Sequence, residues 1–67
     1  MTAIDSTGGG GDWNDTASWN PAQVPTAGDR VTILAGDTIT LTQNESAGSV
    51  TINGTGELVG GGNKLTL

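Results

Sequence analysis

The chain has 67 residues and a formal net charge of −5, and it contains no Cys, His, Tyr or Phe. Its length limits it to one small domain, and the missing side chains exclude zinc sites, disulfides, thiol nucleophiles and imidazole bases. Arg30 and Lys64 are the only cationic side chains, which excludes a nucleic-acid partner, because phosphate recognition needs a basic surface.

Residues 1–11 are expected to form a Gly-rich N-terminal arm. The segment ends in four consecutive glycines and has no apolar pattern after Ile4. A Gly-rich chain is flexible by itself, so we expect a partner to hold the arm through Met1 and Ile4. The segment lacks the basic and apolar regions of a signal peptide, and no apolar run is long enough to span a membrane. The sequence therefore predicts a chain made in the cytoplasm, with no membrane partner.

Residues 12–29 are expected to form a capping loop. They contain both tryptophans and both prolines of the chain. An exposed Trp13 or Trp19 could stack on a sugar ring or fill a pocket of a partner. The alternative, which we favour for at least one of the two, is that the indole closes the end of an apolar core that has no other aromatic side chain. Both tryptophans are candidate partner contacts, together with Leu67 at the other end of the sequence.

Residues 30–67 contain an internal repeat that predicts a β-strand core. Each copy has a Gly, a small polar residue and then an apolar-Thr-apolar triplet, and such self-similarity decides an architecture. The alternation has the period of a strand, so the apolar residues share one face and the Thr residues the other. We expect one set to point inward and stack, and the other to point outward. The inward set is Val31, Ile33, Ile39, Leu41, Val50, Ile52 and Leu65, and the outward set is Thr32, Thr40, Thr51 and Thr66.

The spacing of the copies distinguishes two all-β architectures. Val31 and Val50 are 19 positions apart, as are Ile39 and Leu58. Two strands and two turns per 19 residues fit a coil of a parallel β-helix, in which Val31 would lie over Val50 and Ile39 over Leu58. Asn53-Gly54 between two apolar alternations is a strong hairpin signal instead. A small antiparallel β-meander or sandwich is therefore the alternative.

The order of these features resembles the opening of right-handed parallel β-helix modules. The pattern consists of Trp13-Asn14-Asp15, Ser18-Trp19, Val24-Pro25-Thr26-Ala27-Gly28-Asp29 and the first two apolar-Thr-apolar copies. Such modules occur in phage capsid-decoration and fibre proteins, in bacterial adhesins and in the eight-glycine extracellular domain family. The resemblance runs from about Trp13 to Leu67 and implies a short right-handed parallel β-helix of about two to three coils.

Catalytic and cofactor motifs are missing from the sequence. Gly56 to Gly61 is followed by Gly62, where a phosphate-binding loop needs Lys. Asp12-Trp13-Asn14-Asp15 contains oxygen ligands suited to calcium, but the Gly and Glu required later in an EF-hand are Ala17 and Gln23. The sequence predicts no enzyme activity, no cofactor and no metal.

A structural role in a virion is the function that we expect. The small core and the 12 glycines favour a chain that gains stability from copies of itself, because glycine loses more backbone freedom on folding. We expect a homo-oligomer, specifically a trimer, that decorates or cements a phage head by contact with the major capsid protein lattice. Its location would be the capsid surface of the virion, after synthesis in the host cytoplasm. The alternative is a fibre or adhesin module that binds a glycan or a host surface.

Overall fold

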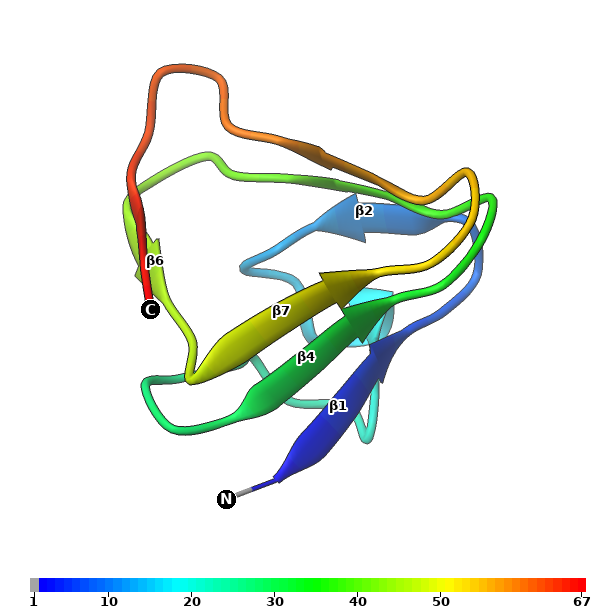
Figure 1. The fold of residues 1–67 in the computed structure, drawn as a ribbon, viewed down its shortest axis with the longest axis horizontal. Coiled ribbons are helices and arrows are strands. Elements are labelled where there is room, and N and C mark those ends of the chain that lie inside the picture. The colour runs from blue at the N-terminus through cyan, green and yellow to red at the C-terminus, as the bar shows by residue number, and fades with distance from the viewer. Residues whose placement is uncertain (1) are drawn as a thin grey trace.

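The structure is a computed structural model that describes residues 2–67. It is a small, mostly-β fold with one short 3-10 helix (Figure 1). The elements are β1 (Ala3–Ser6), β2 (Gly10–Asp12), η1 (Thr16–Ser18), β3 (Trp19–Asn20), β4 (Arg30–Ile33), β5 (Thr38–Thr40), β6 (Glu45–Ser46), β7 (Ser49–Ile52), β8 (Glu57–Val59) and β9 (Leu65–Thr66).

The strands form three separate small sheets. The first has the order β3-β1-β4-β7, the second β2-β5-β8, and the third pairs β6 with β9. Figure 1 shows β1, β4 and β7 side by side on one face of the molecule, with β2 and the segments of β5 and β8 across from them. Apart from β3 and β4, consecutive strands lie in different sheets, because the turns between them change the direction of the chain.

The expected multi-coil parallel β-helix is wrong. The first sheet is mixed, because β3 runs antiparallel to β1 with Ser6 opposite Trp19. The three sheets are short and remain separate, and 67 residues are too few for several coils when residues 12–29 do not repeat the strand pattern. The predicted spacing of 19 residues between partner strands is nevertheless confirmed, since Val31 pairs with Val50 and Ile39 with Leu58, in parallel.

The alternative antiparallel meander is also wrong. Asn53-Gly54 does form a tight turn, in which the Gly56 N–H donates to the Asn53 carbonyl oxygen at 2.8 Å. The strands on either side of this turn, β7 and β8, belong to different sheets. The turn signal was therefore real, but the chain uses it to pass from one sheet to the next.

Residues 3–6 and 10–12 are strands of the sheets, joined by a turn, and do not form an arm. β1 pairs in parallel with β4, and β2 pairs in parallel with β5. The Ile4 side chain is completely buried beside Val31, so it cannot contact a partner as expected. Met1 lies outside the described residues. Removal of residues 1–11 would uncover Val31 and Ile39, and we expect it to unfold the domain.

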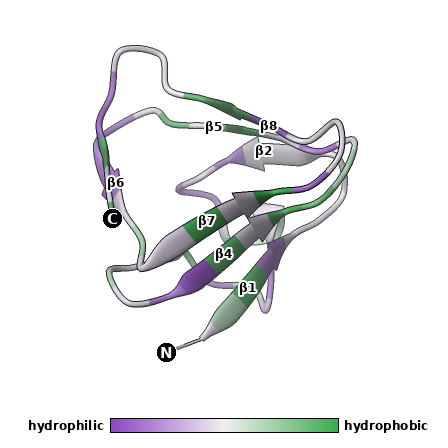
Figure 2. Ribbon diagram, viewed as in Figure 1, coloured by the Kyte–Doolittle hydropathy of each residue, from purple (hydrophilic) through white to green (hydrophobic). Residues whose placement is uncertain are grey.

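The core lies between the first and second sheets and is closed at one end by the two indoles. Figure 2 shows apolar segments on β4, β7 and β8, and Val50 and Leu58 pack against the buried core residues. Most of the predicted inward positions are buried, and Val50 and Leu65 pack against them in part. Ile52 does not follow the prediction, because 46% of its surface is exposed. The buried apolar residues are Ile4, Trp13, Trp19, Val31, Ile33, Ile39, Leu41 and Ala47.

The outward face of the repeat is as predicted. Thr51 and Thr66 are exposed, and Thr32 and Thr40 are half-buried between neighbouring strands. Half-burial at the two earlier positions follows from their place inside a sheet, where side chains of the adjacent strands flank them.

Equivalent positions of the repeat give a first test of this core. Ile33 and Ile52 are direct partners in the register of β4 and β7, but Ile33 is fully buried. We expect Ile33→Ala to lower the free energy of unfolding by about 2–5 kcal/mol and Ile52→Ala by less than about 1 kcal/mol. Urea unfolding of both variants measures the difference. Equal losses would show that Ile52 is covered as well.

Candidate functional site

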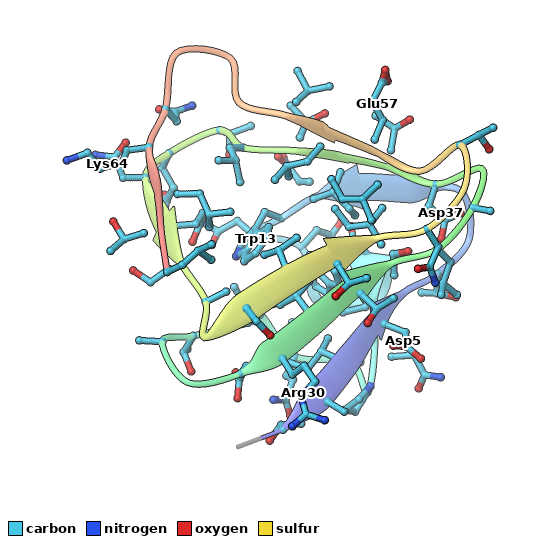
Figure 3. The ribbon with its side chains drawn as sticks, viewed as in Figure 1. Asp5, Trp13, Arg30, Asp37, Glu57 and Lys64 are labelled. Carbon is cyan, nitrogen blue, oxygen red and sulfur yellow. The ribbon has the colours of Figure 1, made fainter. Side chains whose placement is uncertain are left out.

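The apolar core is covered at one end of the fold and partly exposed at the other. We call the end formed by β1, β2, β3 and η1 the closed end, and the end formed by residues 49–67 the open end. Figure 3 shows Trp13 in the interior, whereas Glu57 and Lys64 project from the periphery. The closed end explains the stability of the fold, and the open end is the candidate site.

The two tryptophans form the closed end. Their ring centroids are 5.2 Å apart at an interplanar angle of 76°, which is an edge-to-face pair. The Trp19 Nε1–H donates to the Trp13 carbonyl oxygen at 2.8 Å. The 3-10 turn between them is capped by Asp15, whose carboxylate accepts from the Ala17 N–H at 2.9 Å. This turn folds both rings back over the core.

The burial of both indoles removes two of the predicted partner contacts. Trp13 is completely buried and Trp19 is 2% exposed. Neither ring has a free face for a sugar or for a pocket of another protein. The interpretation that the indoles close the core is correct for both residues, because their packing replaces the aromatic core that the rest of the sequence lacks.

Two aspartates of the repeat hold β1 at both of its ends. Asp29 accepts from the N–H of Thr2 at 3.2 Å and from the N–H and hydroxyl of Thr26 at 2.9 and 3.1 Å. Asp37 accepts from the Ser6 hydroxyl at 2.6 Å. The Ser6 oxygen accepts in turn from the Leu34 N–H at 2.8 Å. Both aspartates follow the Gly of a repeat copy in the sequence, but their long-range partners carried no sequence signal.

The hydrogen bonds of Asp29 change its acidity. The N–H of Thr26 is the main cause that holds the pKa of Asp29 below its ordinary value of 3.8, against the opposing effect of desolvation. A carboxylate held in this way stabilises the fold above its unfolded-state pKa, and this stabilisation is lost as the pH falls through the lowered pKa. Asp29 therefore has a structural role, because both of its carboxylate oxygens accept hydrogen bonds from Thr2 or Thr26.

The pKa of Glu45 is shifted in the opposite direction. Burial, and then the nearby charge of Asp12, raise the pKa of Glu45 above its ordinary value of 4.5. Its Oε2 is buried without a hydrogen bond, as is Nε1 of Trp13. An ionised carboxylate in this position destabilises the folded state.

Replacement of Glu45 gives a pH-dependent prediction. Because the folded-state pKa lies above the unfolded one, the destabilisation is complete at neutral pH and is relieved as the pH falls through the raised pKa towards 4.5. We expect Glu45→Gln to be more stable than the wild type at pH 7 and to lose this part of the pH dependence. Thermal unfolding from pH 7 to 4 measures it, with Glu57→Gln at an exposed position as the control. An unchanged pH profile in Glu45→Gln would contradict the prediction.

The open end exposes apolar side chains of the last strands. Ile52 is 46% exposed, Val59 39% and Leu67 72%. Val50, Leu58 and Leu65 are half-buried beside them, in contact with the core. Among the predicted partner contacts that lie within residues 2–67, Leu67 is thus the one that the structure leaves accessible. Sequence reasoning missed Ile52 and Val59, and the available signal was their place in the last copies of the repeat, where neighbours lie on one side only.

The described residues offer little else that could bind a small ligand. Residues 2–67 enclose no pocket, and they bring together no group of three or more carboxylates that could hold a metal ion. Across the same residues, no helix is long and apolar enough to cross a bilayer.

Comparison of the chain with protein-family models, with curated proteins and with solved structures finds no match.

Proposed function

We propose that this chain is a non-catalytic structural protein of a virion, a capsid decoration or cement protein that stabilises a phage head by contact. The observation that supports the proposal is the open end. It combines half-exposed apolar side chains with the last strands of all three sheets, β7, β8 and β9. Several large apolar side chains exposed at one end of a small domain indicate a site of protein association.

The arrangement suits a protein that assembles on a repeated lattice. The apolar open end supplies a contact between copies, and a homo-oligomer then binds the major capsid protein at several points at once. Several weak contacts in one particle add to a strong attachment without any new contact type. The net charge of −5 keeps the protein soluble and repels the packaged genome.

The anchor to the lattice must differ from the arm that the sequence suggested. Residues 3–6 and 10–12 are strands that pair within the sheets, and Ile4 is buried. Leu67 follows β9, which lies in a different sheet from β7, and it is the most exposed large apolar side chain of the described residues. We assign Leu67 to the lattice contact, whereas the contact between copies uses the β7 edge of the open end. A glycan-binding role would need an exposed aromatic ring, and both indoles are buried.

Binding to particles tests the proposed function. Heads assembled from the major capsid protein of the same genome are mixed with the purified chain and pelleted. We expect saturable binding at a fixed ratio to the capsid subunits and a higher disruption temperature of the decorated heads. Leu67→Ser should lower the occupancy, whereas Leu34→Ser, at a side chain that is 38% exposed, should not. Absence of binding, or binding without saturation, would refute the capsid role.

A further inference from the structure

We propose that the open end binds the open end of a second copy of this chain, in a two-fold symmetric dimer in which β7 pairs antiparallel with β7 of the other copy. This inference rests on the proposed function, because it names the partner and the surface through which the protein assembles. Three observations support it: the free strand edges, the lack of protection at these edges, and the distribution of charge.

The free edges are defined by the hydrogen bonds of β7. The N–H of Ser49 donates to the Asp29 carbonyl oxygen at 3.2 Å, and that of Asn53 to the Ile33 carbonyl oxygen at 2.9 Å. Both groups point back towards β4. Since successive N–H groups of a strand alternate in direction, those of Val50 and Ile52 face the open edge. Two such edges can pair with each other through their main chains.

The open edge lacks the features that normally prevent pairing. Natural edge strands are blocked by charges, by proline, by bulges or by a covering segment. β7 has the sequence Ser-Val-Thr-Ile, without charge or proline, and all four of its residues pair in register with β4 without a bulge. The opposite edge of the same sheet is covered, because β3 pairs with β1. The protein therefore protects one edge of this sheet and leaves the other available.

The charge distribution favours a second copy as the occupant. Residues 1–48 carry six carboxylates and Arg30, so the whole net charge of −5 lies there. Residues 49–67 carry only Glu57 and Lys64 and are neutral. A two-fold contact between open ends keeps the acidic parts of the two copies away from each other.

The strand edges and the small size of the molecule indicate a dimer of modest affinity. Strand edges pair in twos, so a two-fold dimer satisfies both β7 edges, whereas a trimer must use another surface. The Cα extents of 27 × 23 × 20 Å limit one face to about 600 Å², below the roughly 800 Å² that each partner buries in a standard specific interface. We therefore expect a dissociation constant in the micromolar range.

Sedimentation equilibrium with matched variants tests the surface. The wild-type chain should pass from monomer to dimer between about 1 and 500 µM. Ile52→Lys places a charge on the open edge at a half-exposed position and should weaken the dimer at least about tenfold. Leu34→Lys makes the same change at a similarly exposed side chain, 38% against 46%, and should leave the dimer unchanged. Circular dichroism confirms that both variants are folded.

Amide hydrogen exchange tests the strand pairing itself. At concentrations where the dimer forms, the amides of Val50 and Ile52 should exchange more slowly than in the monomer. Those of Ser49 and Asn53 already donate within the chain and should respond little to concentration. A dimer in which the amides of Val50 and Ile52 stay unprotected would overturn the edge pairing.

Several outcomes would reject the proposed dimer. These are a monomer at all concentrations, a trimer, and equal weakening by Ile52→Lys and Leu34→Lys. A monomer that still saturates capsids would refute the dimer and leave the proposed function intact. A dimer that binds no capsid would refute the proposed function and leave this surface intact.

Discussion

Trp19→Ala is expected to lower the free energy of unfolding by about 3–5 kcal/mol. The side chain is 2% exposed and packs edge-to-face on Trp13. Its Nε1–H also satisfies the Trp13 carbonyl oxygen. Because a small single core seldom supplies more than about 3–5 kcal/mol in total, we expect the variant to be largely unfolded at room temperature.

A matched variant separates packing from hydrogen bonding at this position. Trp19→Phe keeps an aromatic ring but leaves the Trp13 carbonyl oxygen without its donor, which costs about 1–3 kcal/mol. Near-ultraviolet circular dichroism and urea unfolding measure both variants. If Trp19→Ala unfolded within about 1 kcal/mol of the wild type, the closed end would not be the centre of stability that we describe.

Gly10→Ala is the second change for which we expect a large loss, about 2–5 kcal/mol. Gly10 has a φ of +94°, and a Cβ there would lie 2.7 Å from the backbone N and C of Thr38 and closer still to its carbonyl oxygen. The left-handed backbone costs about 1–2 kcal/mol for an L-residue. The clash with backbone adds roughly 1–3 kcal/mol, because β2 and β5 must separate.

The neighbouring glycine provides the control. Gly9 has a φ of +86°, and a Cβ there would meet nothing within 4 Å. Gly9→Ala therefore carries the backbone strain alone and should lose about 1–2 kcal/mol. Thermal unfolding of the two variants measures the difference. Equal losses would show that close pairing of β2 with β5 does not require Gly10.

Local sequence patterns encoded only some features of the fold. The four-glycine run looked like a flexible arm, because glycine is permissive in isolation. In the structure its first two glycines form a turn and its last two lie in β2, where Gly10 pairs closely with Thr38. No local pattern distinguishes these two uses of glycine, since the difference lies in a strand 28 positions further along the chain. Ile4 was misjudged for the same reason, because its partner Val31 is distant in sequence.

The sequence by itself determined the strand faces and the register of the repeat. The alternation of apolar residues and Thr placed Val31, Ile33 and Ile39 in the core, and the 19-residue spacing predicted the pairing of Val31 with Val50. Only the tertiary structure decided which repeat positions are buried and which are exposed at each end of the fold. Ile33 and Ile52 occupy the same position of the repeat, but one is buried and the other is 46% exposed. Burial depends on neighbours on both sides of a strand, and β7 has a neighbour on one side only.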